Sequence, residues 1–165
     1  MHRIARSIFM LFIIFPISCK SGKKEAEKNM MLNATRISDG DSFEGRGDAG
    51  TFRIRLYGID APEMGQDFSR KSKETLGDLC KSGPLKVVVI NKDRYGRLVS
   101  NVYNSKGQFI NQIMVAEGMA WHFKKFSSDP LLDNLEKEAR QSRKGLWGLE
   151  NPLPPWEYRK DHRRE

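Results

Sequence analysis

The sequence FRIRLYGIDAPE, residues 52–63, constrains the fold more than any other part of the chain. Its first six residues alternate between apolar and polar side chains, which is the pattern of a half-buried antiparallel strand. Arg53, Arg55 and Tyr57 share the strand face that does not enter the core. Such a face is usual on any exposed strand, and it also suits a site that binds phosphate.

The segments around this strand predict a small α+β domain. Three strands precede the first helix, so the chain lacks the alternation of strands and helices that a parallel sheet requires. We therefore expect a five-stranded antiparallel β-barrel with about three packed helices, and an extended segment after Trp147, where three prolines follow. The other expected strands include residues 32–38, 85–90 and 97–104, and the expected helices cover residues 66–81, 109–118 and a segment starting at Pro130 that buries Leu131, Leu132, Leu135, Ala139 and Leu146.

The composition limits the classes of protein to which the chain can belong. Its 165 residues suit one globular domain with tails, and 29 Lys and Arg against 21 Asp and Glu give a net charge of +8. A basic balance of this size favours polyanionic partners such as nucleic acid or an anionic membrane. Two cysteines exclude a disulfide-stapled scaffold and a Cys-rich zinc site, and the three histidines are too scattered to suggest a histidine-built metal centre.

The first eighteen residues differ in composition from the rest of the chain. Residues 1–18 carry two arginines, then an apolar run and small residues, which is the order of an export signal. Cys19 after Ser18 resembles a bacterial lipoprotein signal, in which the thiol is lipidated and becomes the new N-terminus; secretion after simple cleavage and an uncleaved apolar N-terminus are the alternatives. We expect an exported protein with a polar tether at 19–31, one domain at 32–149 and a Pro-rich, then basic, tail at 150–165.

Two pairs of acidic residues are candidate metal ligands. Asp39 and Asp41 flank Gly40, and in an extended backbone their carboxylates project to the same side. Asp60 and Glu63 form the second pair, at the end of the strand that carries Arg55. Carboxylates without neighbouring His or Cys favour a hard cation such as Ca²⁺ or Mg²⁺ over zinc, although Asp is also common in turns for conformational reasons alone.

Arginines near these acids point to phosphoryl chemistry. The turn DRYGR, residues 93–97, places Arg97 at the start of a strand. Arg55 and Arg97 together with the carboxylates provide cations for developing negative charge and ligands for a metal ion, which are the two requirements of phosphoryl transfer.

The motifs DGDSF, FRIRLYGIDAPE, DRYGR and GLWG resemble those of the thermonuclease family, the staphylococcal nuclease-like proteins. The similarity covers residues 33–149, and PPWEY at residues 154–158 resembles the ending of some bacterial members. The resemblance implies an OB-fold barrel with helices that hydrolyses phosphodiester bonds in DNA and RNA with Ca²⁺ as cofactor. We expect such a protein to be a monomer.

The resemblance also implies a role for each matched residue. Asp41, Asp60 and the backbone carbonyl of Ala61 would ligate calcium, with Asp39 as a support behind them. Glu63 would hold or deprotonate the attacking water, while Arg55 and Arg97 would bind the phosphate and stabilise its transition-state charge. Tyr95 matches a tyrosine near the bound nucleotide.

Other interpretations remain open at this stage. A family tyrosine after the second helix has no clear match, because AWHFKKF offers Phe123 and Phe126, which can stack on bases but lack the hydroxyl. Domains of this fold that bind nucleic acid without cutting it are one alternative function. A surface lipoprotein that binds polyanions through Lys and Arg is another. The basic end of the chain, after residue 158, is expected to be a solvated tail.

Overall fold

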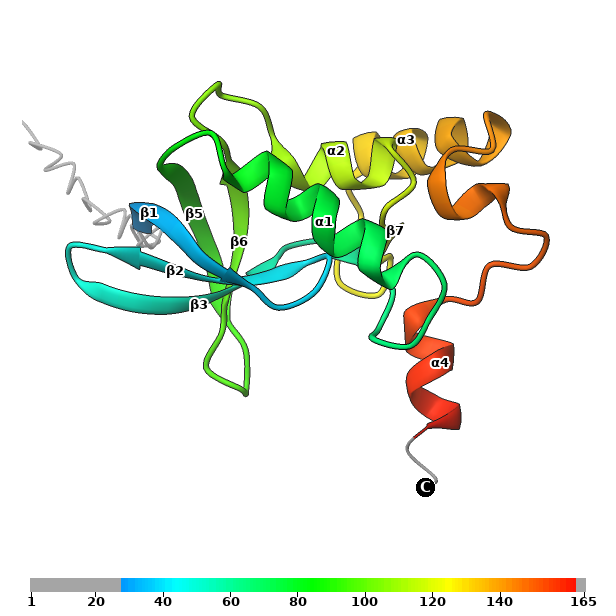
Figure 1. Cartoon of the computed structure of the whole chain (residues 1–165), viewed down its shortest axis with the longest axis horizontal. Coiled ribbons are helices and arrows are strands. Elements are labelled where there is room, and N and C mark those ends of the chain that lie inside the picture. Colours follow the sequence, from blue (N-terminus) through cyan, green and yellow to red (C-terminus); the bar gives the residue numbers. More distant parts are fainter. Residues whose placement is uncertain (1–27, 163–165) are drawn as a thin grey trace, which may run out of the picture.

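Five strands close into a barrel in the computed structural model, which describes residues 28–162 (Figure 1). Around the barrel the order is β1-β2-β3-β6-β5. Alternate residues of these strands point inward, and Phe43, Ile54 and Val87 are among the fully buried side chains. The strands are β1 (Lys28–Ile37), β2 (Ser42–Gly47), β3 (Gly50–Leu56), β5 (Leu85–Lys92) and β6 (Leu98–Tyr103).

One pair of barrel strands runs parallel. The predicted α+β fold, with a five-stranded OB-type barrel, is confirmed, but β3 and β6 pair in parallel whereas the other four pairs are antiparallel. The reason is topological: strand directions cannot alternate all the way around a closed ring of five. β3 ends at this parallel pair and continues directly into the segment that contains Asp60. The candidate site therefore begins beside the pair.

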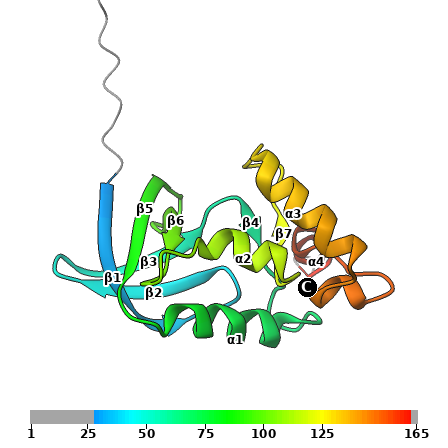
Figure 2. The ribbon, with the colours of Figure 1, turned by 90° about the horizontal axis from the view of Figure 1, so that it is seen from above.

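Helices cover one side of the barrel and extend past its end. Figure 2 shows α1 and α2 beside each other along the barrel, with α3 and α4 beyond it. The N-cap predicted at Asp129 is present, since its side chain accepts a hydrogen bond from Leu131 N, but the Leu131 side chain is exposed because it lies on the outer face of the helix. The helices are α1 (Ser69–Cys80), α2 (Ile110–Ala116), α3 (Pro130–Gln141), the 3-10 turn η1 (Gly145–Gly148) and α4 (Pro155–Asp161).

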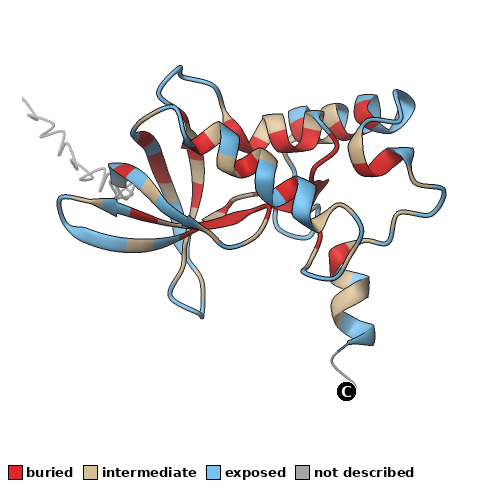
Figure 3. Cartoon of the chain, viewed as in Figure 1, coloured by how far each residue is buried: buried red, intermediate tan, exposed pale blue. Residues whose placement is uncertain are grey.

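A second apolar cluster packs α3 and η1 together outside the barrel. Trp121, Ala139, Leu146 and Trp147 are buried together, and Figure 3 shows buried residues both inside the barrel and on the inner faces of the helices. Among the residues described here, no helix is long and apolar enough to cross a membrane.

The first strand begins earlier than the sequence indicated. The last four residues of the predicted tether, 28–31, pair with β5, where three consecutive valines supply a partner strand. The composition of residues 28–31 does not indicate a strand, because this strand is stabilised by its pairing with β5. The predicted export signal at residues 1–18, the Cys19 anchor and the tether up to residue 27 lie outside the described residues.

The expected extended C-terminal segment is wrong over residues 155–161, which form α4. Pro155 occupies the first turn, where a proline costs no hydrogen bond, and Glu157 and the Arg159-Lys160 pair lie at the ends that favour their charges. The prolines therefore interrupt helical structure only at residues 149–154, before α4 begins.

Candidate functional site

All eight residues proposed from the sequence line one cleft. It has a volume of about 1410 Å³ and opens between the end of the barrel, the β5–β6 turn and the C-terminal helices. The eight are Asp39, Asp41, Arg55, Asp60, Ala61, Glu63, Tyr95 and Arg97.

Arg55 links the two candidate metal-binding carboxylates. Its guanidinium lies 3.0 Å from Asp41 Oδ2 and donates to Asp60 Oδ1 at 2.8 Å. Asp60 belongs to β4 (Ile59–Asp60), which pairs with β7 (Trp121–His122) and is fixed by that short sheet. Asp41 and Asp60 are 5% and 1% exposed, so two carboxylates are held almost out of water around one guanidinium.

The electrostatics of this pair favour an additional positive charge. Burial raises the pKa of the Asp41 carboxyl well above its usual range, and the nearby Asp39 and Asp60 carboxylates add to the effect, while Arg55 opposes it. All candidate ligands here are oxygens, as a hard cation requires. Within residues 28–162, no group of three or more His, Cys, Asp and Glu side chains is close enough to form a metal site by side chains alone.

The loop that carries Asp41 is packed tightly against its neighbours. The Asp39 carboxylate accepts hydrogen bonds from Asp41 N at 2.9 Å and Ser42 Oγ at 2.8 Å. Gly40 lies so close to α1 that a Cβ atom there would be 1.8 Å from Ser72 Oγ. Asp41 Oδ2 in turn accepts from Ala61 N at 2.6 Å, so the loop and the end of β4 are joined directly.

Arg97 and Tyr95 lie on the opposite wall, in the turn between β5 and β6. The Asp93 carboxylate organises this turn, since it accepts from Tyr95 N and Arg97 N at 2.9 Å each and from Arg97 Nε at 2.8 Å. Although its partial burial acts in the other direction, these bonds lower the pKa of Asp93. The Tyr95 ring is exposed, with the Arg94 and Arg97 guanidiniums 5.2 and 5.7 Å from its centre.

Arg159 was not predicted as a site residue, because the end of the chain was expected to be a solvated tail. Arg159 in α4 donates to Asp60 Oδ2 at 2.8 Å and Oδ1 at 3.3 Å, and also to Glu63 Oε1. Partial burial acts to lower the pKa of Arg159, but the bonds to Asp60 and Glu63 outweigh it and raise that pKa above its usual range. Arg159 thus binds two of the proposed catalytic carboxylates from a helix at the far end of the chain.

Three contacts fix α4 beside the cleft. The Trp156 ring stacks on Phe123 with centroids 5.4 Å apart, Gln66 Nε2 donates to Leu153 O at 3.0 Å, and Tyr158 lies against Gly65. The motif PPWEY contained the available signal, because its prolines and Glu157 are typical of a helix start.

Aromatic and basic side chains continue the cleft beyond the carboxylates. Phe123 and Phe126 pack edge to face, and the Phe126 ring is 61% exposed. Lys124 and Lys125 line the cleft between them, although Lys124 also pairs with Asp133 at 2.6 Å. His122 is buried at the edge of the cleft, and neither ring nitrogen has a hydrogen-bond partner among the described residues.

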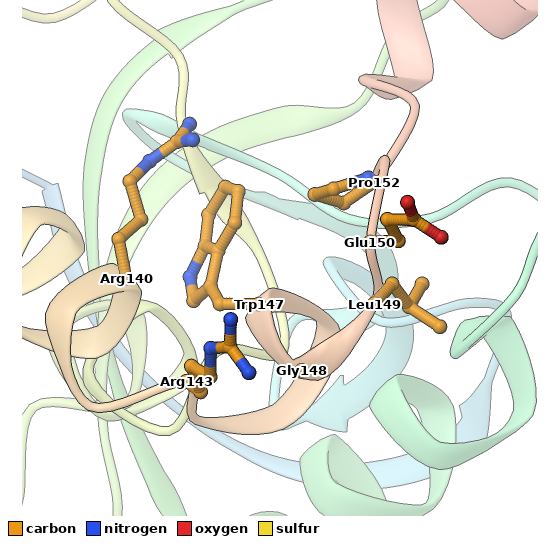
Figure 4. A pocket seen from close by; sticks show the side chains of 7 residues that line it. All are labelled: Arg140, Arg143, Trp147, Gly148, Leu149, Glu150 and Pro152. Atoms are coloured by element: carbon orange, nitrogen blue, oxygen red, sulfur yellow. The ribbon is translucent and has the colours of Figure 1, made fainter.

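A second, smaller pocket lies between the end of α3, η1 and residues 149–152 (Figure 4). The Arg140 guanidinium covers the Trp147 ring at 3.6 Å, and Arg143 and Glu150 flank them. None of the residues proposed from the sequence lines this pocket. The chemistry expected of the chain therefore belongs to the larger cleft.

A comparison with known protein families identifies the family of the chain. The family model described as "Staphylococcal nuclease homologue" matches residues 53–148, more than half of the chain. The chain belongs to the staphylococcal nuclease family. The predicted family is confirmed, and with it the prediction that the chain is a hydrolase of the nuclease type.

Proteins similar to this chain occur in bacteria and plants. An "Uncharacterized endonuclease" of Escherichia coli is 41% identical over 75% of this chain and 81% of its own length. A protein of the same description in Haemophilus influenzae is 37% identical over 93% of this chain and 84% of its own length. The "Staphylococcal-like nuclease CAN1" of Arabidopsis thaliana is 42% identical over 68% of this chain and 34% of its own length.

Proposed function

We propose that the chain hydrolyses phosphodiester bonds in DNA and RNA with little sequence preference, in a calcium-dependent reaction. The observation that carries the proposal is the pair of buried carboxylates, Asp41 and Asp60, bridged by Arg55 inside a cleft that also contains Glu63 and Arg97. The relatives described as endonucleases and nucleases support the reaction class.

The donor atoms fit a calcium ion. Asp41, Asp60 and the Ala61 carbonyl would supply three oxygens, and Ca²⁺ accepts six to eight, so positions are left for water and for a phosphate oxygen. When bound, the ion would polarise the phosphate and bring the water close to it. Mg²⁺ demands a stricter octahedral geometry at shorter distances, which favours calcium for a site built partly from a backbone carbonyl.

The chain's own side chains divide the remaining work. Glu63 would accept a proton from the attacking water while the water oxygen forms a bond to phosphorus. The bond from phosphorus to the leaving oxygen breaks, and that oxygen keeps the electron pair and takes up a proton from solvent. Arg55 and Arg97 donate hydrogen bonds to the phosphate oxygens, whose negative charge increases in the transition state. Tyr95, whose exposed ring lies next to Arg97, would contact the bound nucleotide.

The test is degradation of single- and double-stranded DNA and of RNA by the purified protein in calcium, with a chelator control. Glu63→Gln should lower kcat by about 10²- to 10⁴-fold, which is the usual contribution of a general base. Glu74→Gln, on the exposed side of α1, is the matched control and should retain full activity. Nucleic acid that is bound but left intact in calcium would instead support the non-catalytic binding module.

We also propose that the enzyme acts outside the cytoplasm, anchored by lipid at Cys19 or secreted. The basis is the order of charged, apolar and small residues in the first 19 positions. Labelling cells with a radioactive fatty acid tests the anchor: the label should enter the protein and be lost in Cys19→Ser. The lipid anchor would be contradicted if Cys19→Ser still incorporated the fatty acid, or if the unaltered protein was found without fatty acid in the culture medium.

A further inference from the structure

Arg159 occupies the two carboxylates on which the proposed reaction depends most. It contacts both oxygens of Asp60 and one oxygen of Glu63. Asp60 Oδ1 also accepts from Arg55 at 2.8 Å, so both oxygens of this carboxylate already have cationic partners. The proposed metal ligand and the proposed water-activating group are therefore bridged by one guanidinium.

A calcium ion on these oxygens would be repelled by the guanidinium of Arg159. Calcium binds carboxylate oxygens at about 2.3–2.6 Å, so an ion on the Asp60 side facing Glu63 would lie against the positive charge of Arg159. In addition, Glu63 Oε1 accepts a hydrogen bond from Arg159, so this oxygen is not free to accept a proton from the attacking water.

The charges of the groups joined by ion pairs indicate which partner leaves. Among these groups, Asp41, Asp60 and Glu63 contribute three negative charges and Arg55 one positive charge, which leaves −2 once Arg159 withdraws. A divalent cation neutralises that remainder. With Arg159 in place the cluster carries only −1, which attracts a divalent cation less strongly.

The helix that carries Arg159 is attached in a way that permits withdrawal. α4 has seven residues, only Pro155 of them is buried, and the irregular residues 149–154 connect it to η1. The Arg159 side chain is 30% exposed, whereas that of Arg55 is 13% exposed. A short helix held by few contacts is the kind of element that opens locally at low cost.

We infer that Arg159 competes with calcium for Asp60 and Glu63, so that α4 is a displaceable inhibitory element of the site. This inference rests on the proposed function, because it takes calcium as the ion bound there. Calcium binding and withdrawal of Arg159 are then linked, and each favours the other by the same factor.

Calcium affinity, measured by calorimetric titration without nucleic acid, tests this competition. Arg159→Ala should bind calcium about tenfold more tightly than the unaltered protein, within the usual range for such coupling. Lys160→Ala removes the same charge from the next residue of α4, which also lines the cleft but has no ion pair within residues 28–162, and should change the affinity by less than about twofold. If Arg159→Ala fails to fold, Arg159→Gln serves in its place.

The position of α4 provides a second readout that does not depend on activity. In protein labelled with fluorotryptophan, the ¹⁹F resonance of Trp156, assigned through Trp156→Phe, should shift on calcium addition toward its position in Arg159→Ala. Unchanged or weaker calcium binding by Arg159→Ala, or an equal gain in Lys160→Ala, would overturn the inference. Absence of calcium binding in both the unaltered protein and Arg159→Ala would overturn the proposed function itself, and the inference with it.

Discussion

The two sides of the carboxylate cluster are built in different ways. On the barrel side, Asp41 and Asp60 are buried and held by Arg55 and by the backbone of Ala61. On the α4 side, Arg159 reaches the same cluster from a short helix that is stacked on Phe123 and tied by one side-chain hydrogen bond.

This difference separates a fixed half of the site from an adjustable half. The fixed half depends on close backbone packing, which resists small displacements and so preserves ligand geometry. The adjustable half depends on a few side-chain contacts, which can break without unfolding the domain. Variants on the two sides should therefore fail in different ways: barrel variants lose stability, whereas α4 variants change metal binding.

Removing Arg55 should produce the largest effect on stability. Arg55→Ala leaves Asp41 and Asp60 buried without their shared cation, and breaking such a buried pair costs about 3–5 kcal/mol. The free energy of unfolding, measured in urea, should fall by that amount. Arg53→Ala is the control, because Arg53 lies on the same strand with its side chain exposed, and it should cost less than about 1.5 kcal/mol. Equal losses in the two variants would mean that the barrel side is no more rigid than the surface.

Filling the space at Gly40 should have the next largest effect. In Gly40→Ala the new methyl group collides with Ser72 and Ala61, and overpacking of this kind costs about 1–3 kcal/mol. Nuclease activity should also fall, since Asp41 moves with the loop. Gly77→Ala in the middle of α1 meets its nearest atom at 3.7 Å and should be stabilising by up to about 1 kcal/mol. A stable and fully active Gly40→Ala protein would contradict the close packing.

Loosening α4 should cost little stability and change metal binding. Trp156→Ala removes the stack on Phe123, which is worth about 0.5–1.5 kcal/mol beyond area burial. Because Arg159 is then held less firmly, calcium should bind more tightly than in the unaltered protein. Trp156→Phe keeps a stacking ring and should behave like the unaltered protein. A loss of calcium affinity in Trp156→Ala would indicate that α4 supports the metal site instead of competing for it.

The smallest effect should come from a partly exposed ion-pair group that contacts neither Asp41, Asp60 and Glu63 nor Arg159. Hydrogen bonds from Lys124 and Lys137 lower the pKa of Asp133 to about 2. The contribution of this carboxylate to stability is therefore complete above about pH 4, where Asp ionises in the unfolded chain, and disappears as the pH falls toward 2. Acid unfolding followed by circular dichroism should show a shallower decline over this range in Asp133→Asn. If acid unfolding of Asp133→Asn matches that of the unaltered protein, solvent screening removes the contribution of these ion pairs to stability.

The barrel and most of the site could be predicted because their signals are local. Alternation in residues 52–57, the turn at Gly96 and the cap at Asp129 each specify backbone geometry within a few residues. Site residues with fixed spacing along the chain, such as Asp60, Ala61 and Glu63, line one cleft for the same reason.

Features that depend on partners distant in sequence could not be predicted. The parallel pairing of β3 and β6 follows from ring closure with five strands, which no single segment encodes. The strand at residues 28–31 depends on β5, more than fifty residues later. Arg159 was missed because its role depends on a partner 99 residues earlier in the chain, whereas its immediate neighbours are polar and basic.

The separation of Arg159 from Asp60 also has a consequence during synthesis. At a translation rate of about 5–20 residues per second, the ribosome adds Arg159 roughly 5–20 seconds after Asp60. During that interval the ribosome adds every other strand and helix that lines the cleft, β7 and α3 included, and α4 comes last. The carboxylates of the cluster are therefore all in the chain before the residue that occupies them, and α4 is the last element to join the site in synthesis.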